Sequence, residues 1–359
     1  MKTQAKENVM TLIRNESSVK PRITIYISRA PSQYSHRSYG VRWVHLLKDA
    51  EQQLDSLMAK SKAREILAAL WKVDIEELLG NGRASLAIFH GDGSTQILRI
   101  PMDLQDRCVV ADSFHIKPIL YWVQRDPQFY LLGLDSRSVR LFSGSASGIK
   151  LVHEVTRQEI LPDERISRGA RMKRSVQDTK KKDLLAFFSS AEKEIRAFIG
   201  KNRHPVIVVG VKAHIPVYRS VNRDPDLLTE FITGNPAGWS PQELQTKSTE
   251  ILGRLFESAK DRILHEYNDA EPRGLATTEL TKIIHAAYQG QIRKLMVAHD
   301  LNLWGSFKNT PLRLHSQKTG VEDDVLDDLA ELVLSRGGKV MTLPVSEMPH
   351  FEPAAAILK

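Results

Sequence analysis

The sequence has few of the features that mark secreted, membrane or metal-binding proteins. Cys108 is the only cysteine among 359 residues, which excludes an internal disulfide and a cysteine-based zinc site. No stretch approaches the roughly 18–20 apolar residues that span a bilayer. Residues 1–18 also lack the apolar run of a signal peptide. These absences predict a cytoplasmic protein with no membrane partner.

Common catalytic signatures are missing as well. The sequence contains no phosphate-binding loop ending in Gly-Lys-Ser/Thr, no His-Glu-x-x-His and no Gly-x-Ser-x-Gly elbow. The histidines are scattered without ligand spacing, and we interpret His285 and Asp300 as core or rim residues. Asp135 follows a predicted strand, where a nuclease carboxylate would stand, but no second acid has a matching position. We interpret it as a turn residue and expect no metal and no cofactor.

The charge is segregated along the chain. Lysine and arginine total 51 against 43 acidic residues, a net charge of +8. No acid occurs between Ser17 and Lys48, and residues 165–182 contain Asp178 alone among many basic residues. Residues 320–331 are instead acidic, with Glu322, Asp323, Asp324, Asp327, Asp328 and Glu331. Such segregation is typical of a protein with one surface that meets phosphate and another that does not.

The order of the predicted elements indicates an α/β protein of three domains. Short β-branched runs alternate with helical stretches. Breaks at Asp126-Pro127 and at Gly234-Asn235-Pro236 divide the chain into residues 1–126, 127–238 and 239–359.

The first domain is predicted to contain strands at 22–28, 86–89, 97–100 and 109–110 and helices at 41–58 and 62–79. A hairpin is expected across Gly91-Asp92-Gly93. The second contains a meander at 129–134, 139–142 and 149–155, then a helix at 182–199 and a strand at 205–211, followed by polar turns. The third opens with a helix that Ser240, Pro241 and Glu243 cap and that runs to about residue 265 or 268. Helices at 278–289 and 323–334 and strands at 294–298 and 339–343 follow.

The basic stretch in the second domain is the most informative local feature. Gly169 between arginines permits a close approach of the backbone to a phosphodiester chain, and the planar guanidinium group suits phosphates and stacked bases. A solvated surface loop is the alternative. The residues predicted to bind RNA are Arg165, Arg168, Gly169, Ala170, Arg171, Lys173, Arg174, Lys180 and Lys181.

A second basic stretch follows the first strand. Aromatic side chains beside arginines stack on unpaired bases, at roughly 1–3 kcal/mol per base, while the cations hold the backbone. Local packing of the tyrosines is the alternative. The residues predicted to bind RNA here are Arg29, Tyr34, His36, Arg37, Tyr39 and Arg42.

Residues 278–297 resemble the helix, glycine and strand that open the C-terminal domain of archaeal and eukaryotic release factors. The acidic helix at 324–334, Gly337-Gly338 before a strand, and the ending Ala354-Ala355-Ala356-Ile357-Leu358-Lys359 follow in the order of that family. Residues 129–155 and 206–210 resemble its middle domain. The N-terminal strand and helix resemble the bacterial branch, the release-factor-like proteins that include the Balon-type hibernation factors.

The resemblance implies an RNase H-like middle domain and an L7Ae-like α/β/α C-terminal domain. It also implies a monomer that spans the ribosomal A site. The N-terminal domain would face the decoding centre and 16S rRNA, and the basic loop would face the peptidyl-transferase centre and 23S rRNA. The third domain would face a translational GTPase such as elongation factor Tu, in its GDP or GTP form, with the acidic helix as a candidate contact surface. An ordinary solvated helix is the alternative.

Release factors carry Gly-Gly-Gln in the loop that corresponds to Ser167-Arg168-Gly169-Ala170-Arg171-Met172. No glutamine follows Gly169, since Gln158 and Gln177 lie outside the loop. We therefore expect a ribosome hibernation factor without enzymatic activity. A peptidyl-tRNA hydrolase with altered residues and a rescue adaptor for stalled ribosomes remain the alternatives.

Overall fold

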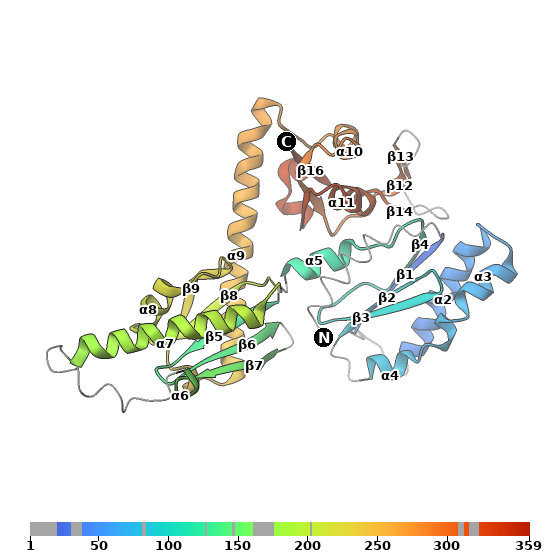
Figure 1. Cartoon of the computed structure of the whole chain (residues 1–359). Helices are drawn as coiled ribbons and strands as arrows, with labels where there is room; N and C mark the ends of the chain where they lie inside the picture. The colour runs from blue at the N-terminus through green and yellow to red at the C-terminus, as the bar shows by residue number, and fades with distance from the viewer. Residues whose placement is uncertain are drawn as a thin grey trace. The chain divides into compact units, whose positions relative to one another are not determined.

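A computed structural model describes residues 20–29, 38–80, 84–125, 128–145, 148–160, 176–201, 203–307, 312–315 and 323–359. The chain divides into two compact units. Unit 1 comprises Met1–Arg125 and Ala259–Lys359, and unit 2 comprises Asp126–Ser258. Each unit combines sheets with helices, which confirms the predicted α/β class (Figure 1).

The N-terminal part of unit 1 is an antiparallel sheet of order β3-β2-β1-β4. Its strands are β1 (Arg22–Ile27), β2 (Ser85–Gly91), β3 (Ser94–Ile100) and β4 (Arg107–Ala111). The helix α2 (Ser38–Asp55) covers one face, and the buried side chains between them form one apolar core (Figure 1). The predicted hairpin is confirmed, with Asp92 and Gly93 both at positive φ in its turn.

The single helix predicted at 62–79 is wrong. The segment folds as α3 (Lys60–Leu67), a 3-10 turn η1 (Leu70–Lys72) and α4 (Ile75–Leu79). The Asp74 carboxylate accepts hydrogen bonds from the amides of Glu76 (3.1 Å) and Glu77 (3.0 Å) and so begins a new helix. Apolar spacing alone did not reveal this cap, which competes with continuation of the preceding helix.

The C-terminal part of unit 1 contains a sheet of order β10-β16-β11-β15. Its strands are β10 (Ala276–Thr277), β11 (Ile292–Ala298), β15 (Lys339–Leu343) and β16 (Ala354–Leu358), with β11 parallel to β15. The helices α10 (Leu280–Tyr288) and α11 (Val325–Ser335) pack against it. A small sheet of β12 (Trp304–Ser306), β13 (Arg313–His315) and β14 (Asp323–Asp324) was not predicted, because two or three residues carry no readable alternation.

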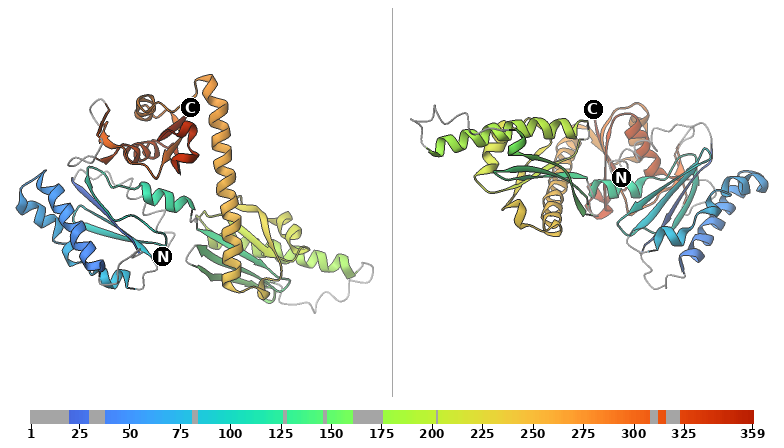
Figure 2. Two further views of the ribbon diagram at one scale, coloured as in Figure 1. Left: turned by 180° about the vertical axis from the view of Figure 1, so that it is seen from behind. Right: turned by 60° about the horizontal axis from the view of Figure 1, so that its bottom comes forward.

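Unit 2 is built on a sheet of order β7-β6-β5-β8-β9. Its strands are β5 (Phe129–Leu134), β6 (Ser138–Ser145), β7 (Gly148–Thr156), β8 (Val206–Gly210) and β9 (Leu227–Thr233). The meander β5-β6-β7 is antiparallel, whereas β5, β8 and β9 run parallel. α7 (Val176–Ile199) lies along one face and the first part of α9 (Pro241–Ala270) along the other (Figure 2).

Unit 2 also corrects two predictions. α7 begins at Val176, six positions before the predicted start at Lys182. The polar turns expected after β8 instead contain α8 (His214–Val221) and the edge strand β9. β9 was missed because its side chains are mostly only partly buried or exposed, which leaves a mixed sequence without a clear alternation. A short helix, α6 (Arg157–Ile160), follows β7.

The predicted capping box of α9 is confirmed. The Glu243 amide donates to Ser240 Oγ at 3.2 Å, and Glu243 Oε2 accepts from the Ser240 amide at 2.9 Å. The helix continues to Ala270, so that its residues up to Ser258 belong to unit 2 and those from Ala259 to unit 1. No helix among the described residues is long and apolar enough to cross a membrane.

Gly144 provides a test of the packing in unit 2. A Cβ at this position would lie 2.3 Å from Cζ of the buried Phe129. Gly144→Ala should therefore lower the free energy of unfolding of unit 2 by about 1–3 kcal/mol, measured by urea denaturation. Gly253 in α9 is the matched control, because an added Cβ meets nothing within 4 Å. Gly253→Ala should stabilise the helix by about 0.5–1 kcal/mol, and equal effects would contradict this packing.

Candidate functional site

The described residues of the N-terminal basic stretch are held by contacts within the unit. The Tyr39 ring is 2% exposed, and its hydroxyl donates to the carbonyl of Arg29 at 2.9 Å. Arg42 Nε donates to Asp106 at 2.6 Å, while its guanidinium group lies 5.5 Å from the centre of the Tyr39 ring. Arg29 Nε lies 2.8 Å from Asp103. Tyr34, His36 and Arg37 lie outside the described residues.

These contacts give the segment acidic partners that are distant in the sequence. Asp103 and Asp106 follow β3, more than 60 positions from the arginines that they neutralise. An ion pair with an acid cancels much of the attraction of an arginine for phosphate. The stretch is rich in basic residues in the sequence. In the structure, the ion pairs of Arg29 and Arg42 make its described part less positive than the sequence indicates.

The second basic stretch is described only at its end. Lys180 and Lys181 are exposed in the first part of α7, and neither has an ion-pair partner among the residues that the structure describes. Arg165, Arg168, Gly169, Ala170, Arg171, Lys173 and Arg174 lie outside those residues. The two lysines extend the predicted basic loop onto a regular helix of unit 2.

The acidic helix differs from both interpretations of the sequence. The sequence predicts either a partner-facing or a solvated helix, but α11 is buried along most of its length. Asp324 and Asp327 are 0% exposed and Asp328 is 4% exposed. Buried carboxylates require partners, and residues 113–117 supply several of them.

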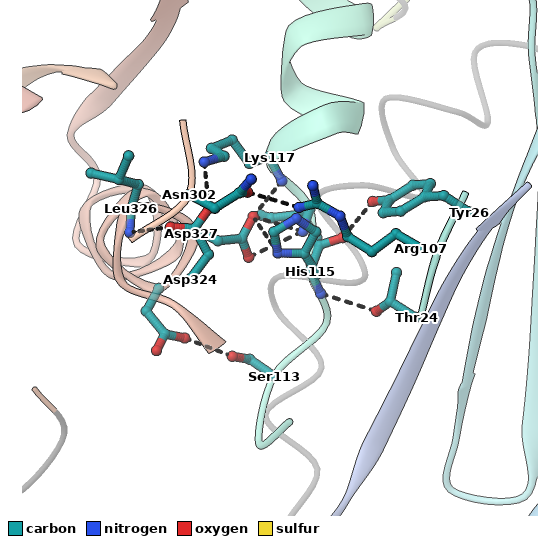
Figure 3. A network of polar contacts seen from close by, with 12 residues as sticks. Thr24, Tyr26, Arg107, Ser113, His115, Lys117, Asn302, Asp324, Leu326 and Asp327 are labelled. Carbon is teal, nitrogen blue, oxygen red and sulfur yellow. Dashed lines mark hydrogen bonds and ion pairs between the residues drawn. The ribbon is translucent and has the colours of Figure 1, made fainter. Parts of the chain in front are cut away.

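The carboxylate of Asp324 is the centre of the first group of contacts (Figure 3). It accepts hydrogen bonds from the amides of Leu326 (3.1 Å) and Leu303 (3.0 Å), and it forms an ion pair with the ammonium group of Lys117. Lys117 is 1% exposed and also donates to the carbonyl oxygen of Leu301. A lysine is tolerated in this interior because both its carboxylate and its carbonyl partner are satisfied there.

Asp327 is the centre of the second group. Its carboxylate accepts from the amide of Ile116 at 2.9 Å and from the amide of Lys117, at the start of α5 (Lys117–Arg125). A carboxylate at this end stabilises a helix through its unpaired amides and its dipole. The imidazole of the fully buried His115 lies 3.7 Å from the same carboxylate (Figure 3).

Further hydrogen bonds extend this network on both sides. Ser113 Oγ donates to Asp328 at 2.9 Å, and Arg107 Nη1 donates to Asn302 Oδ1 at 2.7 Å. Gln124 accepts from the amide of Thr342 at 2.9 Å. The N-terminal sheet and α5 are thus joined to the C-terminal sheet region by polar contacts between buried or partly buried groups. We call this set of contacts the α5–α11 network.

The sequence contained a weak signal for the α5–α11 network. Lys117 is the one charged residue in the otherwise apolar stretch Ile116–Leu120, and two aspartates interrupt the apolar positions of α11. Each oddity alone has an ordinary explanation. The ion pair joins Lys117 to Asp324, which lie 207 positions apart. Sequence patterns do not predict which residues meet over such a separation.

His299 lies beside the network. Its ring packs against Tyr121 in a tilted arrangement, with the ring centres 3.8 Å apart and an angle of 31° between the planes. Burial lowers the pKa of His299 below its ordinary value; the negative charges of Asp300 and Glu347 oppose this shift, and the positive charges of Arg125 and Lys117 add to it. The imidazole is therefore neutral at pH 7.

The other candidate residues have structural contacts. Asp135 accepts from Ser136 Oγ at 3.1 Å and from the Arg137 amide at 3.2 Å, as a turn residue does. The Asp300 carboxylate accepts from the Val345 amide at 2.9 Å, and the His285 ring contacts Gln289 at 2.8 Å. Within the described part of the chain, no three His, Cys, Asp or Glu residues form a group that would hold a metal ion.

Comparison with known proteins identifies part of the chain. Residues 128–291 match the family model of bacterial archaeo-eukaryotic release factor family 3. This match confirms the resemblance to the release-factor-like family over those residues, which include unit 2 and the predicted basic loop. No curated protein matches the sequence.

Solved structures show weaker similarity. Pelota from Archaeoglobus fulgidus is 14% identical with a TM-score of 0.31, and the alignment covers 77% of this chain and 79% of that one. Dom34 from S. cerevisiae, a translation termination-like factor, is 11% identical with a TM-score of 0.43 and coverages of 78% and 80%. Archaeal Pelota in a ribosome-bound model with ABCE1 is 10% identical with a TM-score of 0.43 and coverages of 98% and 93%. At these scores the three structures add no argument about function.

The α5–α11 network predicts the effect of removing its lysine. Lys117→Met leaves the buried Asp324 carboxylate without its cation, which should lower the free energy of unfolding of unit 1 by about 3–5 kcal/mol. Hydrogen exchange of the amides in α5 and α11 measures the loss. Arg64→Met is the control, because Arg64 is 74% exposed and lies 3.5 Å from Glu51. It should change stability by less than about 0.5 kcal/mol, and similar values for the two variants would contradict the role of the network.

The histidines predict how stability depends on pH. Burial lowers the pKa of both His299 and His90 from 6.5. Below pH 6.5 the unfolded chain takes up protons at these positions that the folded chain does not, so stability falls as the pH falls. Thermal unfolding of unit 1 between pH 5 and 7.5 should show this slope, and His299→Gln should reduce it. A slope that is unchanged in the variant would contradict the assignment.

Proposed function

We propose that this chain, of which residues 128–291 match bacterial archaeo-eukaryotic release factor family 3, is a release factor homologue that acts as a ribosome hibernation factor. It binds in the A site through contacts with ribosomal RNA and keeps the ribosome inactive without cutting a bond. The protein acts as a monomer in the cytoplasm, where the ribosomes are. Its three domains, residues 1–126, 127–238 and 239–359, face the decoding centre, the peptidyl-transferase centre and a GTPase.

One observation carries this proposal. The segment that matches the release factor family contains a loop whose sequence, Ser167–Met172, lacks Gly-Gly-Gln and is rich in cations instead. In release factors the glutamine loop positions water at the ester of peptidyl-tRNA. Loss of that motif removes hydrolysis, whereas the cations retain affinity for the phosphates of RNA. A binding function follows more directly than a catalytic one.

The charges of the described residues support a binding surface on unit 2. Lys180 and Lys181 are exposed at the start of α7, next to the basic loop in the sequence. In the N-terminal stretch, by contrast, Arg29 and Arg42 contact aspartates. Contacts of that stretch with the decoding centre are therefore proposed for Tyr34, His36 and Arg37, which lie outside the described residues.

A GTPase such as elongation factor Tu is the proposed protein partner of residues 239–359. The acidic helix is not its contact surface, because Asp324, Asp327 and Asp328 are buried. Other exposed residues of this region would form the contact. Co-purification of elongation factor Tu with ribosomes that carry this chain tests the partner separately from ribosome binding.

Ribosome binding should weaken steeply with salt. Each phosphate that a lysine or arginine neutralises releases counterions, so about six contacts imply a loss of roughly 1,000-fold in affinity between 50 and 200 mM salt. Co-sedimentation with purified ribosomes measures this dependence. Arg168→Glu, Arg171→Glu and Arg174→Glu together should abolish pelleting at moderate salt, and Lys180→Glu with Lys181→Glu should reduce it.

The matched control reverses two exposed lysines outside the proposed surface. Lys60→Glu with Lys62→Glu in α3 changes the net charge by the same amount as the pair in α7. It should leave pelleting nearly as in the wild type. Equal losses for the two pairs would show a general charge effect and would contradict a specific surface on unit 2.

The alternative is a rescue or peptide-release factor, and a direct assay separates the two. The chain is incubated with ribosomes that carry peptidyl-tRNA, and free peptide is measured. Hibernation predicts no release above background. Release that depends on residues 165–174 would establish the alternative.

A further inference from the structure

A cavity of about 260 Å³ lies in unit 1 beside the α5–α11 network. Its walls come from β1, the residues before and in β4, the start of α5 and residues 299–302. The volume is near the lower end of the range of roughly 300–1,000 Å³ that is usual for small-molecule sites. It suits a compact ligand and is too small for a dinucleotide.

One wall of the cavity carries Arg107. Its Nη1 donates to Asn302, and its guanidinium carbon lies 5.7 Å from the centre of the Trp304 ring. Among the residues that the structure describes, Arg107 makes no ion pair with a carboxylate. A guanidinium group has five N–H donors in a planar fork, so Arg107 retains donors that match the oxygens of a phosphate.

Another wall is aromatic. Tyr121 and His299, whose rings are in contact, both line the cavity. The imidazole of His299 is neutral at pH 7, so that it offers a π-surface without a charge. Aromatic side chains of this kind are the usual partners of planar bases, at roughly 5- to 150-fold in affinity per stacked base.

The cavity also contains acceptors. Asp103 is neutralised by Arg29 at 2.8 Å, and one oxygen of Asp300 accepts from the Val345 amide. Their remaining oxygens would accept hydrogen bonds from hydroxyl or amino groups. A ligand with a phosphate, hydroxyl groups and a planar ring therefore finds complementary chemistry on each wall.

We propose that this cavity binds a single nucleotide, with the phosphate at Arg107 and the base at the Tyr121–His299 pair. The nucleotide is either a free mononucleotide or one unstacked residue of an RNA chain, since both present the same chemistry. The first source is independent of the proposed ribosome binding. The second deepens it, because the unstacked residue would belong to ribosomal RNA.

The experiment titrates the full chain with AMP and with adenosine by calorimetry. Arg107→Gln should weaken AMP roughly tenfold or more, since it removes the charged donors, and should leave adenosine nearly unchanged. His299→Ala should weaken both ligands. Arg99→Gln is the matched control, because Arg99 is exposed on β3 and does not line the cavity. It should bind both ligands as the wild type does.

Hydrogen exchange of the wild-type chain with and without AMP tests the site without relying on variants, which could fail to fold. AMP should slow hydrogen exchange in residues 102–107 and 299–302. Hexaadenylate that displaces AMP would support the RNA source, and hexaadenylate that does not would support the free nucleotide. Absence of AMP binding, a footprint elsewhere, or full affinity in both Arg107→Gln and His299→Ala would overturn the proposal. Arg107→Gln is also tested for co-sedimentation with ribosomes. If AMP does not bind but this variant still pellets with ribosomes, the nucleotide site is excluded while the proposed ribosome binding stands.

Discussion

The buried contact between Lys117 and Asp324, with Asp327 at the start of α5, organises unit 1. Removing charges from water is costly, and the cost is offset only where each charge finds a partner and further hydrogen bonds. Asp324 before α11, Asp327 and Asp328 within it, and the residues from Ser113 to Lys117 meet this condition together. Neither segment would bury these groups without the other. The N-terminal and C-terminal parts of the chain are therefore mutually dependent in their folding.

The acidic helix therefore has a different role from the one that its composition indicates: it is part of the interior of unit 1, not of a charged surface. A run of acids usually marks a solvated surface. At the start of α11, the buried Asp324, Asp327 and Asp328 contact backbone amides, a lysine and a serine of the same unit, so these three carboxylates are not available to a partner. The same holds for Arg29 and Arg42, whose charges meet aspartates from the segment after β3. Several charged side chains of unit 1 are therefore paired within the unit, while Lys180 and Lys181 in unit 2 are exposed.

The sequence predicted those parts of the fold that depend on local rules. The strands β1 to β4 of the N-terminal sheet and β5 to β8 of unit 2 were predicted where apolar residues alternate or run together, and Ser240, Pro241 and Glu243 marked the start of α9. The break at Asp74 was missed because a side-chain cap overrides apolar spacing. The short strands β12 to β14 and the edge strand β9 are defined by pairing rather than by pattern. The α5–α11 network depends on contacts across about 200 positions, which no local rule reaches.

The central claim is that unit 2 brings a cationic loop to ribosomal RNA. Photo-crosslinking from an amino acid introduced at position 170, followed by mapping of the modified nucleotides, measures this contact directly. The account predicts cross-links to 23S rRNA at the peptidyl-transferase centre on intact ribosomes. Cross-links to ribosomal proteins alone, or none at a ribosome concentration that saturates pelleting, would contradict it.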